Sequence, residues 1–107
     1  MPLIRVDTNV KVDNEEKFIL GFSKLAAETL NTPEGLFGVI LNQNLKFCFA
    51  GTFDPAFMVS LDAITVGNPG VNRKVVEEFT KYLEKELGTP KDRGYIFLNN
   101  PGANNVG

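Results

Sequence analysis

The residue of this chain with the most distinctive chemical potential is the second one, Pro2. If Met1 is removed, Pro2 becomes the amino terminus and carries a secondary amine instead of an amide nitrogen. A free α-amino group has a pKa of about 7.7–8 in model peptides, and burial in an apolar pocket lowers that pKa. Such an amine could serve as a general base near neutral pH. The competing interpretation is an ordinary first strand that happens to begin with a proline.

Few other residues offer catalytic chemistry. The sequence contains no histidine and a single cysteine, Cys48. This composition argues against Ser-His-Asp triads, the usual zinc sites and an intrachain disulfide. We therefore expect no metal site of these kinds, and we expect Cys48 to be a buried strand residue.

The charge and hydropathy of the sequence limit the classes of binding partner that we expect. The net charge is −2 and there is no basic block, so nucleic acid is not expected as a partner. No apolar run approaches the roughly 18 residues that span a bilayer, so no membrane insertion is expected. We expect a protein of the cytoplasm, or one secreted without a conventional signal peptide.

The elements that must position Pro2 follow from periodicity. Leu3, Arg5 and Asp7 alternate with residues 4, 6 and 8, as in a strand. Asp13 or Asn14 can cap a helix that ends before Pro33, and a second helix begins near 71–72. Further strands are predicted over 36–41, 45–50, 56–66 and 95–98.

An internal repeat organises these elements. Residues 30–33 read Leu-Asn-Thr-Pro and residues 87–90 read Leu-Gly-Thr-Pro, each at a predicted helix end. We predict one domain over 1–107 with pseudo-repeats about 1–50 and 56–107. Each repeat is a β-α-β unit, which gives an α+β fold: a four-stranded mixed sheet with two helices on one face, plus short extra strands.

The predicted sheet has an uncovered face. The strands are apolar on both faces: Phe37, Val39 and Leu41 alternate with Leu36 and Ile40. Strands with two apolar faces require burial on both sides. Association of the uncovered face with other copies of the chain is therefore expected.

With these features, the chain resembles the macrophage migration inhibitory factor (MIF) family, which includes D-dopachrome tautomerase, within the tautomerase superfamily. The matching residues run along nearly the whole chain: Met1-Pro2, Thr8-Asn9-Val10, Pro33, Phe49, Gly51, Asp54-Pro55, Ser60-Leu61, Ile64, Asn72-Arg73, Asp92-Arg93, Tyr95-Ile96, Ala103 and Asn105-Val106-Gly107. The resemblance implies a homotrimer whose sheets line a central solvent channel, with active sites at the subunit interfaces.

The resemblance also implies a reaction and the residues that serve it. Family members lose the initiator methionine, and Pro2 would be the general base of keto–enol tautomerisation on phenylpyruvate-like or dopachrome-like compounds. Ile64 would contact the substrate through its backbone and side chain, and Val106 would form part of the pocket wall. Tyr95 would enter from a neighbouring subunit, where its hydroxyl could donate a hydrogen bond or a proton.

Two pocket positions depart from the family pattern. Thr32 stands where the family usually has a lysine that binds the substrate carboxylate, and a hydroxyl provides no charge. Phe97 stands where several members have an asparagine, which makes the pocket more apolar. In addition, the chain ends at Gly107, before the aromatic-containing tail typical of the family, so we expect a less closed pocket.

These departures keep other functions open. One alternative is a catalytically weak or inactive MIF-like protein that binds a cell-surface cytokine receptor. Another is hydration or dehalogenation of a small unsaturated acid, for which Arg5 or Arg93 would have to bind the acid. The Cys-X-X-C motif of some members is absent, because residues 56–59 are Ala-Phe-Met-Val, so a thiol–disulfide role is not expected.

Overall fold

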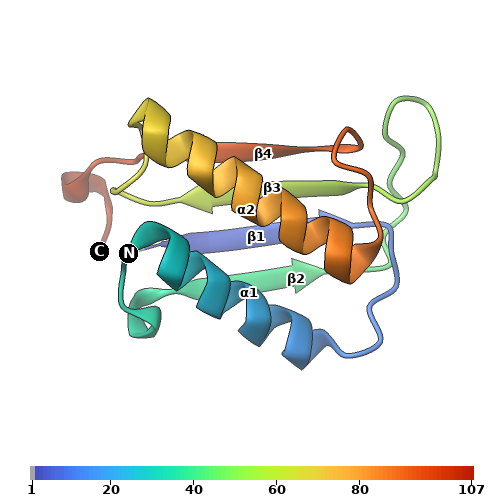
Figure 1. The fold of residues 1–107 in the computed structure, drawn as a ribbon, viewed down its shortest axis with the longest axis horizontal. Coiled ribbons are helices and arrows are strands. Elements are labelled where there is room, and N and C mark those ends of the chain that lie inside the picture. Colours follow the sequence, from blue (N-terminus) through green and yellow to red (C-terminus); the bar gives the residue numbers. More distant parts are fainter. Residues whose placement is uncertain (1) are drawn as a thin grey trace.

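The computed structural model describes residues 2–107 as one sheet packed under two helices (Figure 1). The elements in chain order are β1 (Leu3–Thr8), α1 (Glu15–Leu30), the short 3₁₀ helix η1 (Glu34–Leu36), β2 (Gly38–Asn42), β3 (Phe57–Asp62), α2 (Pro69–Leu87), β4 (Gly94–Asn99) and the 3₁₀ helix η2 (Ala103–Asn105). Within this range, no helix is both long and apolar enough to cross a bilayer.

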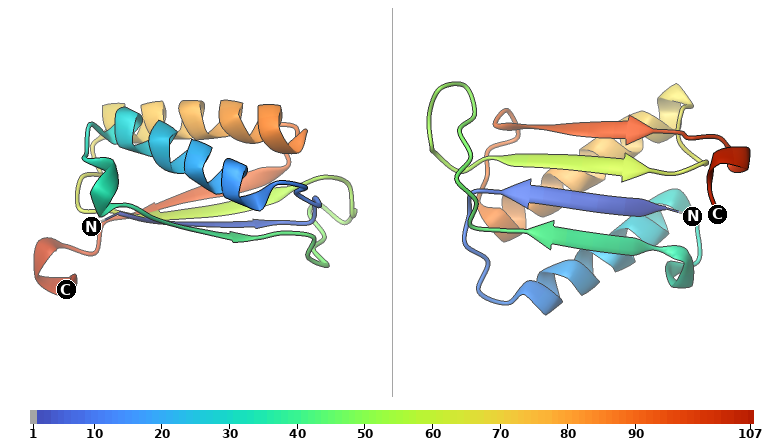
Figure 2. Two further views of the ribbon diagram at one scale, coloured as in Figure 1. Left: turned by 90° about the horizontal axis from the view of Figure 1, so that it is seen from below. Right: turned by 180° about the vertical axis from the view of Figure 1, so that it is seen from behind.

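The sheet pairing confirms the predicted fold class. The strand order is β2-β1-β3-β4, with β1 parallel to β2, β3 parallel to β4, and β1 antiparallel to β3. Each parallel pair is connected through a helix, and both helices cover the same face (Figure 2). A parallel pair requires such a crossover, because a tight turn cannot bring the chain back to the same end of the sheet.

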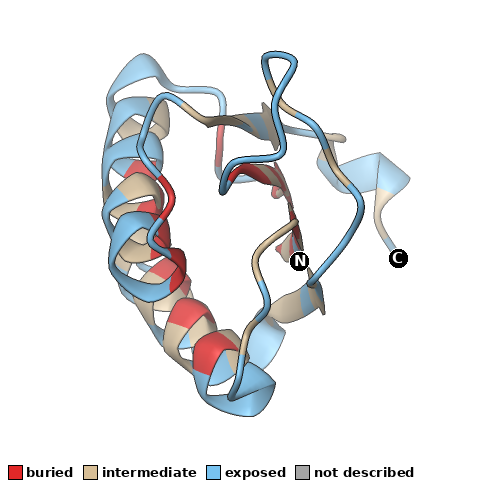
Figure 3. Ribbon diagram, turned by 90° about the vertical axis from the view of Figure 1, so that its right-hand side faces the viewer, coloured by how far each residue is buried: buried red, intermediate tan, exposed pale blue. Residues whose placement is uncertain are grey.

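The core lies between the sheet and the helices (Figure 3). Alternate residues of the central strands point into it and are fully buried, including Ile4, Val6 and Leu61. The ring of Phe22 meets that of Phe79 edge-to-face at 4.7 Å, which joins α1 to α2. Aromatic pairs of this geometry stabilise a core beyond the area they bury.

Asparagine caps determine where both helices begin. The Asn14 side chain accepts a hydrogen bond from the Lys17 N–H, as one of the two predicted caps. Asn68 accepts from the Gly70 and Val71 N–H groups, so α2 begins at Pro69 and not near 71–72 as predicted. Proline is favoured at the first helical position, where no N–H is needed.

The prediction of a strand over residues 45–50 is wrong. Only Phe49 and Thr52 are paired there, in an isolated bridge across a turn in which Ala50 and Gly51 have positive φ. The Leu45 N–H donates to the Thr8 carbonyl at 3.0 Å, at the end of β1, but the rest of the segment has no neighbouring strand in the described chain. A strand forms only beside such a partner. Cys48 is accordingly exposed and not buried as predicted. The strand predicted over 56–66 is shorter and ends at Asp62.

The uncovered face of the sheet is more apolar on its edge strands than on its central strands, where Leu3 and Met58 are the apolar residues. Its central strands present mainly polar side chains there, namely Arg5, Asp7, Ser60 and Asp62. The edge strands place Ile40, Tyr95 and Phe97 on the same face, all of them exposed. The expectation of two apolar faces is therefore wrong for β1 and β3.

Candidate active site

Pro2 lies at the end of the sheet where β1 begins. It is buried, and its carbonyl accepts a hydrogen bond of 3.0 Å from the Gly38 N–H. This bond extends the β1–β2 ladder by one residue and fixes the backbone of Pro2. The nitrogen of Pro2 therefore sits at a defined place beside the sheet.

Two other predicted site residues belong to the same end. Because β3 runs antiparallel to β1, Leu3 pairs with Asp62, and Ile64 follows two residues later. The side chain of Ile64 is 44% exposed. The chain returns to this end after β4, so the carboxyl-terminal segment lies at the same end of the molecule as the start of β1 (Figure 1). Val106, which is half-buried, is part of that returning segment.

Asn100 joins the returning segment to the Ile64 loop. Its Nδ2 donates to the carbonyl oxygens of Ile64 at 3.1 Å and Val66 at 3.0 Å, while its Oδ1 accepts from the Gly102 N–H at 2.9 Å. The sequence prediction missed this role. The available signal was an asparagine directly before Pro101 and Gly102, a pattern typical of side-chain-stabilised turns.

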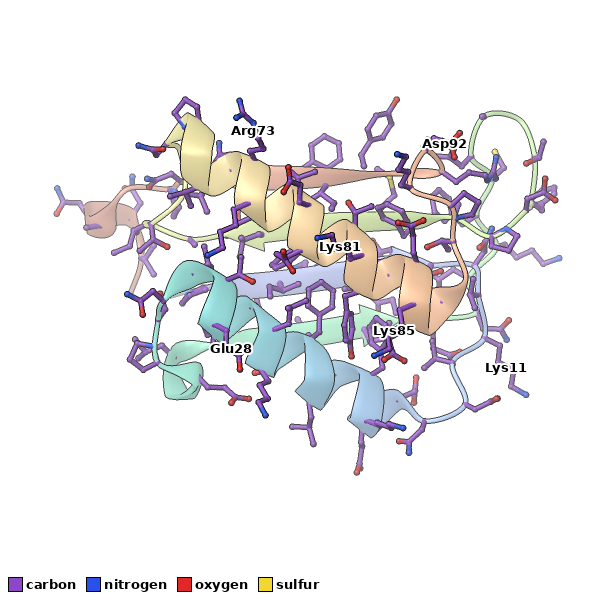
Figure 4. The ribbon with its side chains drawn as sticks, in the orientation of Figure 1. Lys11, Glu28, Arg73, Lys81, Lys85 and Asp92 are labelled. Carbon is purple, nitrogen blue, oxygen red and sulfur yellow. The ribbon has the colours of Figure 1, made fainter. Side chains whose placement is uncertain are left out.

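The hydroxyl of Thr32 already donates its proton to a backbone carbonyl of the same chain. Its Oγ1 donates to the Leu30 carbonyl at 3.1 Å, and its N–H donates to the Ala27 carbonyl at 3.0 Å. A hydroxyl has one proton to donate, so in this geometry Thr32 can only accept a further hydrogen bond. Thr32 borders a shallow hollow of about 370 Å³, whose charged lining residue is Glu28. Figure 4 shows Glu28 on α1, toward the carboxyl end of the helix.

Tyr95 and Phe97 do not share a pocket with Pro2 in one chain. Tyr95 pairs with Met58, which pairs with Asp7, five residues along the chain from Pro2. At about 3.3 Å per strand residue, Tyr95 lies about 16 Å from Pro2 along the strands, and two strands away. Phe97 lies two residues nearer to the Pro2 end of the sheet and pairs with Ser60. The predicted site residues thus form two half-sites.

The second half-site is aromatic. The Phe49 ring lies 5.4 Å from the Tyr95 ring, and Tyr95 lies 6.0 Å from Phe97. Tyr95 is 59% exposed and Phe97 is 51% exposed. A shallow hollow of about 400 Å³ lies beside them, and its lining includes Met58 and Cys48. This arrangement offers a flat apolar surface with one phenolic hydroxyl.

A loop anchored at both ends carries Phe49 to Tyr95. The guanidinium of Arg93 donates from Nε to the Pro55 carbonyl at 3.1 Å and from Nη2 to the Asp54 carbonyl at 3.0 Å. The Asn9 side chain donates to the carbonyls of Phe47, Phe53 and Asp54 and accepts from the Ala56 N–H. Figure 4 places Asp92, next to Arg93, at the end of the molecule that bears this loop.

Comparison with known proteins identifies close relatives over the whole chain. The family model described as "Macrophage migration inhibitory factor (MIF)" matches residues 1–107. A macrophage migration inhibitory factor homolog from Trichinella spiralis is 32% identical over 108 residues, covering 100% of this chain and 95% of the relative. A homolog from Trichuris trichiura is 34% identical over 110 residues, with the same coverage of 100% and 95%.

Solved structures show the same arrangement of elements. The structure of the macrophage migration inhibitory factor from Trichinella spiralis superposes with a TM-score of 0.91 at 29% identity, over 98% of this chain and 94% of that chain. The homologue from Prochlorococcus marinus superposes with a TM-score of 0.85 at 26% identity, over 91% and 86% of the two chains.

Proposed function

This chain belongs to the macrophage migration inhibitory factor family, and from that premise we propose that it is a tautomerase with the amine of Pro2 as its general base. The substrates would be phenylpyruvate-like or dopachrome-like compounds. The assembly would be a homotrimer, and each active site would combine the Pro2 end of one subunit with the Tyr95 half-site of a neighbour.

The observation that carries this proposal is the position of Pro2. It is buried, its backbone is fixed by Gly38, and Ile64 and the segment of Val106 converge on the same end of the sheet. A general base needs a fixed position and an environment that disfavours its charged form. The amine is free only once Met1 is removed, and Met1 lies outside the described residues.

The half-sites support a shared active site. Tyr95 and Pro2 are too far apart to act on one small molecule within one chain, about 16 Å along the strands. A second copy of the chain can bring its own Tyr95 to the first copy's Pro2. The exposed Ile40, Tyr95 and Phe97 on the edge strands would lose solvent contact in such an assembly.

The proposed reaction moves two protons and needs no cofactor. The Pro2 nitrogen takes a proton from the carbon next to the substrate carbonyl, and the electron pair of that C–H bond forms the enolate. The Tyr95 hydroxyl donates a hydrogen bond or a proton to the enolate oxygen. The enolate oxygen takes its proton from Tyr95, which regains one from solvent, or directly from solvent while Tyr95 holds the hydrogen bond. The Pro2 ammonium returns its proton to solvent, so the base is restored and the substrate has become the enol.

Replacing Pro2 tests the proposal. In Pro2→Gly, we expect turnover of phenylpyruvate and of dopachrome methyl ester to fall by about 10²- to 10⁴-fold, the usual contribution of a positioned general base. The folded fraction should stay unchanged by circular dichroism. Intact mass must first establish that Met1 has been removed from both proteins. A Met1-free parent that turns over neither substrate would contradict the proposal.

A second candidate function is a receptor-binding protein with little catalysis. The observation that favours it is the Thr32 hydroxyl, which is already bonded to the Leu30 carbonyl and adds no positive charge for an acid substrate. Negligible turnover by the parent, together with an undiminished cellular binding response in Pro2→Gly, would favour this candidate over the tautomerase.

A further inference from the structure

We propose that Arg93 is a positioning residue for the aromatic half-site: it holds the loop of residues 44–56 so that Phe49 supports the ring of Tyr95. The inference rests on the proposed function for its catalytic consequence, since only there does Tyr95 meet substrate. Its structural part, the support of the Tyr95 ring, stands on the contacts alone. Arg93 was a candidate for direct acid binding, and its hydrogen bonds assign it this other role.

The contacts of Arg93 explain why an arginine suits this position. Nε and Nη2 donate to two successive carbonyls, those of Pro55 and Asp54, at 3.1 and 3.0 Å. The guanidinium carbon also lies 5.4 Å from the centre of the Phe49 ring. The planar guanidinium can bond two acceptors and stack on an aromatic face at the same time, whereas a lysine ammonium cannot reproduce the fork.

Hydrogen bonds within the loop of residues 44–56 and to Asn9 also fix the position of Phe49. Phe49 and Thr52 exchange both backbone hydrogen bonds, at 2.9 and 3.1 Å, which closes a tight turn over Ala50 and Gly51. Asn9 holds the loop from the sheet side through the carbonyls at both of its limbs. With the turn closed and both limbs bonded, the Phe49 ring has a defined position.

Within one chain, Tyr95 depends on that position because its surroundings are open. Its side chain is 59% exposed, and its ring contacts are Phe49 at 5.4 Å and Phe97 at 6.0 Å. Phe97 is on the same strand and moves with Tyr95, whereas Phe49 belongs to a separate segment. Of these two aromatic rings, Phe49 is therefore the one that can fix the Tyr95 ring relative to the rest of the fold.

Tyrosine fluorescence tests the structural part directly. The chain has two tyrosines and no tryptophan, so Tyr82→Phe leaves Tyr95 as the sole emitter. In that background, Arg93→Ala should raise acrylamide quenching of Tyr95 and lower its anisotropy, and Phe49→Leu should do the same. Lys91→Ala is the matched control. It removes a positive charge at an exposed position of the segment between α2 and β4, which also carries Arg93.

Kinetics test the catalytic part. Arg93→Ala should raise KM for an aromatic substrate by about three- to tenfold, with a smaller change in kcat. This change in KM corresponds to the binding free energy of one aromatic contact. The pH profile should not move, because the base lies in the other half-site. Arg93→Lys should recover part of the loss, since it keeps one donor and the charge near Phe49.

The outcomes separate this inference from the proposed function. Unchanged quenching and anisotropy in Arg93→Ala would overturn the positioning role. Changed fluorescence with an unchanged KM would confirm that Arg93 positions Tyr95 and would overturn the role of Tyr95 in the pocket. If Arg93→Ala does not fold, Phe49→Leu takes its place, because it leaves the hydrogen bonds of Arg93 intact. Phe49→Leu must then show the raised quenching and the lowered anisotropy of Tyr95.

Discussion

At the residue scale, Thr32 is the proposed site residue from which we predict a substrate preference. Its hydroxyl donates to the Leu30 carbonyl, and the hollow beside it is lined by the acidic Glu28. A substrate carboxylate would therefore meet no charge-assisted donor at this position, and such hydrogen bonds are roughly twice as strong as neutral ones. We expect a preference for esters over free acids.

Thr32→Lys should shift that preference. We expect kcat/KM for phenylpyruvate to rise by about tenfold relative to that for dopachrome methyl ester, since a charged donor adds about 1.4 kcal/mol of binding to the acid alone. Thr32→Val is the matched control, because it removes the hydroxyl without adding charge and should leave the ratio unchanged. An unaltered ratio in Thr32→Lys would place the carboxylate elsewhere.

At the element scale, a glycine and a tyrosine add a hydrogen bond to the contact between α1 and α2. The Tyr82 hydroxyl donates to the Phe18 carbonyl at 2.8 Å, across the helix pair. A Cβ at Gly21 would collide with that hydroxyl, so glycine is required for the approach. Burial, and to a lesser degree the charge of Glu86, raise the pKa of Tyr82 to about 12.

This raised pKa predicts a loss of stability at alkaline pH. The folded-state pKa lies above the ordinary value of 10, so the contribution of Tyr82 is complete below pH 10 and is lost as pH rises toward 12. Urea unfolding should show the stability advantage of the parent over Tyr82→Phe shrinking across that window. Contributions that the two proteins share cancel in the difference. A constant difference would contradict the prediction.

At the scale of the whole molecule, the proposed site residues are distributed over opposite ends of one sheet. Pro2, Ile64 and Val106 belong to one end, whereas Tyr95 and Phe49 belong to the other. A head-to-tail ring of identical subunits brings unlike ends together at every interface. The proposed homotrimer follows this logic, and it makes each active site dependent on two chains.

Subunit mixing tests this dependence. Pro2→Gly and Tyr95→Ala should each be impaired alone, but a refolded equal mixture should regain activity. In a cyclic assembly with random order, about a quarter of the sites combine an intact Pro2 with an intact Tyr95. Activity of the mixture is compared with that of the two variants refolded separately. A mixture no more active than its components would contradict the shared site.

Much of the fold could be predicted from local patterns. The alternation of Leu3, Arg5 and Asp7 with residues 4, 6 and 8 predicted the strand β1, and Asn14 was one of two predicted caps. The β-α-β repeats were also predicted correctly. The failure at 45–50 has a clear cause: strand-like residues form a strand only beside a partner, and periodicity does not reveal whether one exists.

The sequence by itself determined the periodicities, the helix caps and the presence of a proline able to become an amino-terminal base. Only the tertiary structure decided which of the singled-out residues lie together, and it divided them between two ends of the sheet. It also revealed Asn9, Arg93 and Asn100 as anchors. These side chains bind backbone carbonyls of residues 34 to 45 positions away in the chain, and every residue type has such a carbonyl. Local sequence cannot encode a partner that only the folded chain brings near.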